Sequence, residues 1–205
     1  MNSDRNSPIA GRFRGYYPVV VDVETAGFNP VKDALLEAAV VFLQVDPDGV
    51  WYPLETISKH IRPFPGANLD KAALEFTGID PDHPFRQEIA VSEKQALREI
   101  FQAVKRMMKQ NGCSRAILVG HNPAFDLSFI NAAANRCGLT RNPFHPFSTF
   151  DTATLGGLAY GQTVLSRAVQ AAGLDWEEEE AHSARYDAER TAELFCNIVN
   201  LWPLH

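Results

Sequence analysis

Cysteine is scarce in this sequence. The three cysteines, Cys113, Cys137 and Cys196, lie far apart and form no Cys-x-x-Cys pair. This spacing supports neither a disulfide framework nor a zinc cluster, and it is typical of free thiols in a reducing compartment. Long apolar runs are also missing, both in the polar segment 1–15 and beyond it, so neither a signal peptide nor a membrane span is indicated. We therefore expect a soluble, cytoplasmic protein.

Basic residues are outnumbered by acidic ones, 19 Lys and Arg against 25 Asp and Glu, which gives a formal net charge of −6. This sign does not exclude a nucleic-acid partner, because binding depends on local patches and bound metal more than on net charge. The 205 residues, of which 45% are hydrophobic, suit one compact domain with a sizeable core. We expect a single domain over residues 1–205.

Two acids end an otherwise apolar stretch at residues 16–24. The β-branched run Val19–Val21 and Val23 favour an extended strand, whose period of two places Asp22 and Glu24 on the same face. Two carboxylates so close repel each other unless a cation lies between them, and a divalent metal ion is the obvious candidate. The alternative from this stretch alone is a strand end that has reached solvent.

The remaining chain alternates between strand and helix patterns. A Pro-Asp-Gly turn follows residue 46, and residues 92–95 have the form of a capping box that opens an amphipathic helix. The patterns predict strands at 35–45, 51–62 and 116–119, helices at 71–76, 93–111, 125–137, 164–172 and 184–201, and loops around 79–84 and 141–150. The second loop leads to Asp151, which we expect to cap the next helix. A three-stranded meander followed by alternating helices and strands predicts an α/β fold, with a central mixed sheet flanked by helices and the first strand in its middle.

A third acid follows the strand predicted at 116–119. Residues 120–126, Gly-His-Asn-Pro-Ala-Phe-Asp, form a tight loop from which Asp126 enters the next helix. Such strand-to-helix transitions are where ligand sites form in open α/β sheets. Taken alone, Asp126 is most simply a first-turn acid that complements the helix dipole.

A fourth acid belongs to the last predicted helix. Asp187 lies on the stripe of Thr191, Leu194 and Ile198, so it points inward and needs a partner. His182 precedes Asp187 by five residues, next to an acidic loop, where it can approach the same site. A lone histidine is more often an ordinary surface residue, and only this spacing favours function.

Together these motifs resemble those of the DEDD exonuclease superfamily, in its histidine-bearing branch, which has a ribonuclease H-like fold. Asp22 and Glu24 resemble the first motif, His121 to Asp126 the second, and His182 to Asp187 the third. Within the branch the chain is similar to the ribonuclease T family, since residues 11–20, 141–147 and 161–166 resemble stretches typical of it. The resemblance covers nearly the whole chain.

The resemblance implies a 3′–5′ exoribonuclease. Asp22, Glu24, Asp126 and Asp187 would hold two divalent cations, and four carboxylates without a thiol suit Mg²⁺ or Mn²⁺. His182 would take the proton from the attacking water, and the product would be a nucleoside 5′-monophosphate. The implied substrates are single-stranded 3′ ends of transfer RNA and ribosomal RNA precursors, with DNA 3′ ends as a further substrate.

Four phenylalanines match positions at which the family sandwiches the last bases. They are Phe28, Phe76, Phe125 and Phe147. Stacking on a ring suits any base, so these residues would grip a single strand with little sequence readout. Core packing is the alternative, above all for Phe125. Ala72 departs from the family, whose members can carry a glutamate there that helps judge the terminal base, so the resemblance does not decide whether 3′ cytosine is discriminated against.

Basic residues at Arg12, Arg14, Lys109 and Arg115 match a nucleic-acid-binding patch of the family. There the patch of one subunit faces the active site of the other, which implies a homodimer. Without the resemblance these are four unrelated surface charges. Two other readings of the whole chain remain: a proofreading-type or oligoribonuclease-like exonuclease, and a catalytically silent nucleic-acid-binding module. The aromatic segment around Phe147 argues against the first, and the intact motifs argue against the second.

Overall fold

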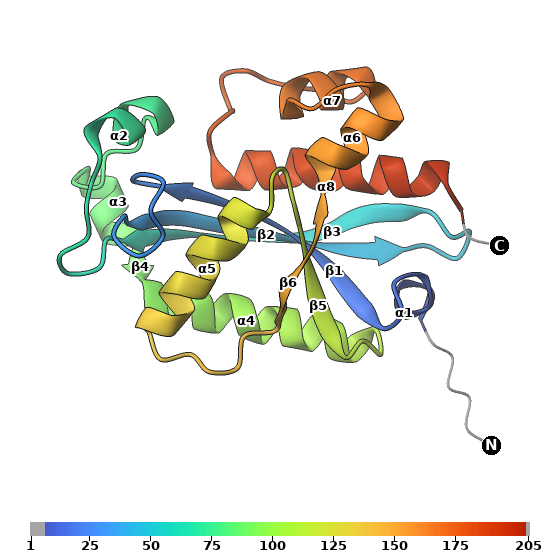
Figure 1. Cartoon of the computed structure of the whole chain (residues 1–205), viewed down its shortest axis with the longest axis horizontal. Helices are drawn as coiled ribbons and strands as arrows, with labels where there is room; N and C mark the ends of the chain where they lie inside the picture. The colour runs from blue at the N-terminus through green and yellow to red at the C-terminus, as the bar shows by residue number, and fades with distance from the viewer. Residues whose placement is uncertain (1–6, 204–205) are drawn as a thin grey trace.

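The computed structural model describes residues 7–203. Residues 1–6, with Arg5 of the predicted polar segment, and residues 204–205 lie outside the described part. The centre of the fold is a six-stranded mixed sheet with the order β4-β3-β2-β1-β5-β6, and helices cover both of its faces (Figure 1). The predicted α/β architecture, with the first strand inside the sheet, is therefore confirmed. The strands are β1 (Tyr16–Thr25), β2 (Leu35–Val45), β3 (Trp51–Arg62), β4 (Val91–Ser92), β5 (Arg115–Gly120) and β6 (Phe144–Asp151). The helices are α1 (Pro8–Arg12), α2 (Lys71–Thr77), α3 (Pro84–Ile89), α4 (Glu93–Gln110), α5 (Ala124–Arg136), α6 (Thr152–Tyr160), α7 (Leu165–Ala171) and α8 (Ala184–Leu201).

The first three strands form the predicted antiparallel meander. The turn between β2 and β3 is held by Asp46, whose Oδ1 accepts hydrogen bonds from the backbone N–H groups of Asp48 and Val50 at 2.9 and 2.8 Å. β5 then pairs in parallel with β1, and β6 with β5. The carboxyl ends of β1, β5 and β6 consequently lie on the same side of the sheet, where the strands end, and ligands bind beyond these strand ends in such folds.

Two long helices cover the sheet from opposite sides, α8 on one face and α4 on the other (Figure 1). The Ser92 hydroxyl caps α4 by accepting a hydrogen bond from the Gln95 N–H at 3.3 Å, as the capping box predicts. Leu97, Ile100 and Val104 of α4 are fully buried, and each such side chain contributes roughly 1.5–3 kcal/mol of burial free energy. This packing fixes both faces of β1.

The expected loop at 141–150 is wrong for most of its length, because residues 144–151 form the edge strand β6. Its pairing with β5 is interrupted by a bulge between Phe144 and Thr149. Pro146 lies within this bulge, where no hydrogen bond from its nitrogen is needed, and proline is tolerated on edge strands for that reason. The strand ends at Asp151, which caps α6 as expected by accepting hydrogen bonds from Ala153 and Thr154.

Three short elements were absent from the sequence prediction: α1, α3 and β4. The first two begin with a proline in the first helical turn, Pro8 and Pro84, a position where its missing N–H costs nothing. None of the three is long enough to show a hydrophobic period. Across residues 7–203, no helix combines the length and apolar character that crossing a membrane requires.

Candidate active site

Three carboxylates meet at the carboxyl end of β1. Asp22 and Glu24 share one face of this strand, as their spacing predicts, and Asp187 reaches them from the first turn of α8. One oxygen of each carboxylate lies within 4.8 Å of the oxygens of the other two. Glu24 is buried, whereas Asp22 and Asp187 are half-buried. Residues 165 positions apart in the chain are thus brought to one point.

Asp126 lies beside this group, buried in the first turn of α5. Its Oδ1 accepts a hydrogen bond from the backbone N–H of Val23 at 3.0 Å. Because Val23 stands between Asp22 and Glu24, this bond fixes Asp126 against the strand that carries both. Asp126 is not one of the three residues whose oxygens share the 4.8 Å limit, but it adjoins them. We call the four acids the carboxylate cluster.

The carboxylate cluster holds its protons unusually tightly. Burial is the main cause for all four acids, and it raises the pKa of Glu24 to about 8, of Asp126 to about 7 and of Asp187 to about 6. The pKa of Asp22 is raised well above its ordinary value by burial and then by the neighbouring negative charges of Asp126, Asp187 and Glu24. Each charged carboxylate therefore makes its neighbours harder to ionise.

No lysine or arginine in the described part of the chain forms an ion pair with the carboxylate cluster. None of the ion pairs formed within residues 7–203 includes any of the four acids. Oδ1 of Asp187 is buried without a hydrogen-bond partner. A set of oxygen ligands with unmet negative charge fits a hard divalent cation such as Mg²⁺ or Mn²⁺, and this fit rests on the donor atoms present.

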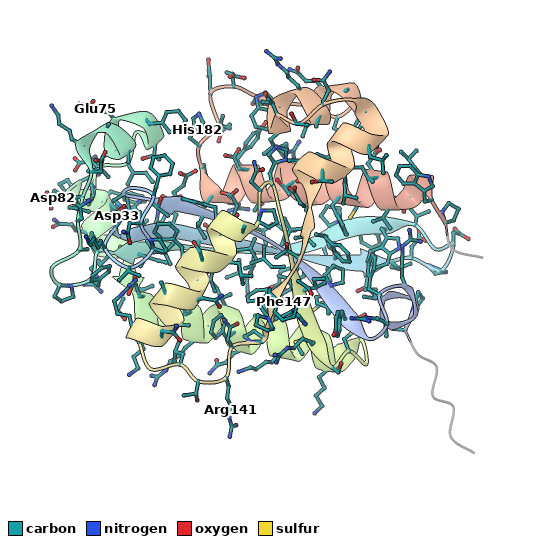
Figure 2. All side chains as sticks on the ribbon, viewed as in Figure 1. Asp33, Glu75, Asp82, Arg141, Phe147 and His182 are labelled. Carbon is teal, nitrogen blue, oxygen red and sulfur yellow. The ribbon has the colours of Figure 1, made fainter. Side chains whose placement is uncertain are left out.

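His182 lies at the rim of the carboxylate cluster, just before α8. Its backbone N–H donates to Oδ2 of Asp187 at 3.3 Å, and its charge lowers the pKa of Asp187 against the larger effect of burial. The imidazole is exposed and packs on the ring of Phe76 in α2, with 4.6 Å between the ring centroids. Figure 2 shows His182 on the side of the molecule that carries α2.

A pocket of about 400 Å³ adjoins the carboxylate cluster, and three of the four predicted phenylalanines line it together with Glu24. Phe28 and Phe76 are 87% and 69% exposed, so their rings stand free. Phe125 is half-buried and contacts Phe28 edge-on, with 6.2 Å between the centroids. Ala72 also lines this pocket. We call this cavity the phenylalanine pocket.

Gly27 makes the exposed position of Phe28 possible. Its φ of +148° is a backbone conformation that other residues rarely adopt, and the Asp33 carboxylate occupies the space that a β-carbon at Gly27 would need. That carboxylate accepts a hydrogen bond from the Asn29 N–H at 2.8 Å and so closes the turn that presents the ring. Phe28 is therefore held out by the turn rather than left exposed by chance.

Phe147, the fourth predicted phenylalanine, does not line the phenylalanine pocket. It lies in the bulge of β6, 80% exposed, with its ring against His145 at 4.6 Å between centroids (Figure 2). The His145 Nδ1 accepts hydrogen bonds from the backbone N–H groups of Phe147 and Ser148, which shapes the bulge. Its position depends on how β6 pairs with β5.

The four predicted basic residues lie near the starts of β1 and β5, away from the carboxylate cluster. Arg14 packs over Tyr16, which pairs with Arg115 in the neighbouring strand, and Lys109 lies in the last turn of α4. Tyr16 and Glu24 are eight steps apart along the extended strand, or roughly 26 Å. Arg12 is engaged differently, because its guanidinium donates to two backbone carbonyls at the end of α8, at 2.6 and 3.3 Å.

Two polar groups beside the site were missed from the sequence. His121 is 3.0 Å from the Thr152 hydroxyl through Nδ1 and 2.8 Å from a backbone carbonyl of the α6–α7 connection through Nε2, so it ties the loop before Asp126 to α6. The second group is Glu37 of β2 with Arg86 of α3, paired at 2.7 Å. A single acid within the apolar run 35–45 was the available signal for Glu37.

Comparison with protein families gives one match that covers most of the chain. The family model described as an exonuclease matches residues 19–195, which include the whole carboxylate cluster, His182 and the phenylalanine pocket.

Solved structures with the same fold include several of exonuclease I. The Escherichia coli enzyme in complex with a dT13 oligonucleotide has a TM-score of 0.68 and 17% identity, over 90% of this chain and 41% of that one. Its zinc-bound complex with single-stranded DNA has a TM-score of 0.68 and 17% identity, over 92% and 41%. The moderately thermophilic enzyme from Methylocaldum szegediense has a TM-score of 0.63 and 17% identity, over 90% and 40%. The chain spans about two fifths of the length of these proteins, and likeness at this identity confirms the predicted ribonuclease H-like exonuclease fold.

Proposed function

The chain belongs to the exonuclease family, and on that premise we propose that it is a 3′–5′ exoribonuclease of the ribonuclease T type. The observation that carries this proposal is the uncompensated carboxylate cluster next to the phenylalanine pocket. The cluster suits hydrolysis of a phosphodiester, and the pocket suits a terminal base. The products are nucleoside 5′-monophosphates released one at a time from the 3′ end.

Asp22, Glu24, Asp126 and Asp187 are the proposed ligands of Mg²⁺ or Mn²⁺. Two such cations, when bound, polarise the phosphate and lower the pKa of the attacking water. The residues of the cluster position these cations. The hydrogen bond from the Val23 N–H orients Asp126, and Asp187 keeps one buried oxygen free for a cation. Burial keeps water away from these charges and so strengthens every electrostatic interaction at the site.

His182 is the proposed general base, which takes the proton of the attacking water. Its ring is exposed, and its backbone N–H donates to Oδ2 of Asp187, which places the imidazole at the rim of the carboxylate cluster. In this structure the ring packs on Phe76, which also lines the phenylalanine pocket, so the proposed general base and the proposed site for the terminal base are adjacent.

The phenylalanine pocket is the proposed site for the terminal base. Phe28 and Phe76 offer exposed ring faces, and each base stack contributes about 1–3 kcal/mol whatever the base. The polar groups that line the pocket, such as Asp70 and Thr77, are few, and Ala72 adds none. This lining supports weak discrimination among 3′ bases, including cytosine.

The proposed substrates are transfer RNA and ribosomal RNA precursors with short single-stranded 3′ ends. DNA is the second candidate, because similar exonuclease I structures hold single-stranded DNA oligonucleotides. Arg14, Lys109 and Arg115 form the proposed patch for the upstream backbone, and Arg12 is a weaker member because carbonyls of α8 already engage it. The separation of patch and cluster favours a homodimer in which each patch serves the partner's site. A cytoplasmic location goes with these substrates.

The test is degradation of matched RNA and DNA strands, single-stranded and with short 3′ overhangs, labelled at either end and assayed with and without Mg²⁺. We expect Mg²⁺-dependent release of nucleoside 5′-monophosphates from the 3′ end, faster on RNA. Faster cleavage of DNA would move the assignment to a proofreading-type or exonuclease I-like activity. Tight binding without any hydrolysis would instead favour the catalytically silent module.

A further inference from the structure

A buried ion pair lies beside the carboxylate cluster, on the neighbouring strand. Arg86 donates from Nη1 to Oε1 of Glu37 at 2.7 Å and from Nη2 to the backbone carbonyl of Leu36. Glu37 is 7% exposed and Arg86 is 8% exposed, so neither charge is solvated. His60 completes the group, with Nδ1 at 2.9 Å from Oε1 of Glu37. Arg86 is thus held by two oxygens, one of them charged.

This ion pair adjoins the cluster through the sheet. Glu37 of β2 is the cross-strand partner of Glu24 of β1, and the side chains of directly opposite residues in an antiparallel pair lie on the same face. The negative charge of Glu37 is felt at the site, since it contributes to the raised pKa of both Glu24 and Asp22. Glu37 is therefore a fifth acid beside the four acids of the cluster, and unlike them it forms an ion pair with an arginine.

Arg86 comes from a different part of the chain. It belongs to the short helix α3, 49 residues after Glu37, and α3 follows the α2 helix that carries Phe76. The guanidinium therefore joins the segment that forms one wall of the phenylalanine pocket to the strand beside the cluster. This contact alone would be an anchor for α3, and it needs no connection with cations.

We propose that Arg86 is a positioning residue that acts through Glu37, offsetting part of the charge of this fifth acid so that a divalent cation is held mainly by the four acids of the cluster. The inference rests on the proposed cation-binding role of that cluster. Its physical basis is that a full charge buried one strand away is poorly screened. Opposite changes to the pair must then shift cation affinity in opposite directions, whereas an anchor would change stability alone.

The experiment is a titration of the protein with Mn²⁺ alone at pH 8. Binding is measured by calorimetry and by the electron paramagnetic resonance signal of free Mn²⁺. In Glu37→Gln, the Arg86 charge is left uncompensated, so we expect affinity at least about tenfold weaker. In Arg86→Met, the Glu37 charge is left unmatched, so we expect tighter affinity than that of the native protein. The double variant carries neither charge and should return close to the native value.

A matched control is available in the chain. Glu93 and Arg136 form another buried ion pair at 2.7 Å, and Glu93 is not among the charges that raise the pKa of Asp22 or Glu24. Glu93→Gln should therefore lower stability without changing Mn²⁺ affinity. Melting of each metal-free variant separates stability from affinity.

Native affinity in Glu37→Gln would overturn the inference and leave the pair as an anchor. Should Glu37→Gln fail to fold, Arg86→Met is compared with the double variant, because these two differ only in the Glu37 charge. Equal Mn²⁺ affinities of these two variants would overturn the inference. Failure of the proposed function looks different: Asp22→Asn would then bind Mn²⁺ as the native protein does. Loss of binding in Asp22→Asn with no change in Glu37→Gln would reject only the role of Arg86.

Discussion

The protein contains two kinds of buried acid. Glu93, at the start of α4, is 5% exposed and receives two hydrogen bonds from Arg136, at 2.7 and 3.0 Å. Glu24, at the end of β1, is 9% exposed and has no cationic partner in the described part of the chain. Both carboxylates have left water, but only one of them is compensated by the fold itself.

The comparison separates a structural acid from one that waits for a ligand. A buried charge is costly unless it is paired, so an uncompensated group remains protonated or receives a cation from solution. The Arg136 guanidinium also lies over the ring of Phe64 at 3.9 Å, which locks the Glu93 pair into the packing of α4 and α5. Substitution at the two sites should consequently affect different properties: stability at Glu93 and activity at the carboxylate cluster that contains Glu24.

The largest expected effect is on activity, from Asp22→Asn. Loss of a cation ligand should reduce the hydrolysis rate by roughly 10⁴-fold, or about 5 kcal/mol, because bound metal contributes several kcal/mol to the transition state. The metal-free variant should melt at or above the native temperature, since one repulsive charge is gone. Rate assays beside thermal melting measure both, and Asp48→Asn in the exposed β2–β3 turn is the control. Native activity would remove Asp22 from the site.

His182→Ala should slow hydrolysis by about 10²–10⁴-fold, the usual contribution of a general base, while substrate affinity changes little. Single-turnover kinetics with a labelled oligonucleotide separate the chemical step from binding. His83→Ala is the matched control, because His83 is an exposed histidine whose side chain makes no capping hydrogen bond. Normal chemistry with weakened binding would make His182 a substrate contact rather than a base.

On the structural side of the comparison, Glu93→Gln should lower the free energy of unfolding by about 3 kcal/mol, because it leaves Arg136 without its charged partner. The rate of hydrolysis at saturating Mg²⁺ should stay near that of the native protein. Urea unfolding and rate assays on one preparation provide both values. A fall in activity without loss of stability would break the distinction between the two kinds of acid.

Phe76→Ala should weaken binding of a single-stranded 3′ end by about 1–3 kcal/mol through the loss of one stacking face. Phe85→Ala is a close control, since Phe85 is 63% exposed against 69% for Phe76 but lies in α3, outside the phenylalanine pocket. Binding titrations with strands that differ only in the 3′ base also measure discrimination. Equal losses in both variants would show that the pocket does not hold the base.

Local patterns in the sequence were sufficient to predict the strand that carries Asp22 and Glu24 and several of the helices. The valine run before Asp22 and the capping box at 92–95 each specify structure within a few residues, and the strand and helix followed as predicted. The inward position of Asp187 also follows from the helical period alone. Local patterns therefore identified the four acids as candidates, but they did not predict the distances between them.

The parts that escaped prediction depend on contacts between distant residues. β6 was expected as a loop because Pro146 breaks its pattern, and only pairing with β5 shows it to be a strand. Arg86 has no local signal for its partner Glu37, which lies 49 residues away. The place of Phe147 outside the phenylalanine pocket follows from the same strand pairing. No helical or strand period carries this information.

The most direct test of the uncompensated carboxylate cluster is the pH dependence of stability in the metal-free protein. In the folded state the pKa values of Asp187, Asp126 and Glu24 are about 6, 7 and 8, against ordinary values of 3.8 for Asp and 4.5 for Glu. The folded protein thus binds more protons than the unfolded chain in this range, so stability falls with rising pH. The contribution is complete below about pH 4 and is lost as the pH passes through 6 to 8.

The measurement is urea unfolding between pH 5 and pH 8.5, on the native protein and Asp22→Asn, with and without Mn²⁺. The difference between the two proteins removes the titration of groups elsewhere, such as His121. We expect the metal-free native protein to lose more stability with rising pH than Asp22→Asn, and Mn²⁺ to restore it most strongly at high pH. Equal pH profiles for the two proteins, unchanged by Mn²⁺, would contradict a cluster built to receive a cation.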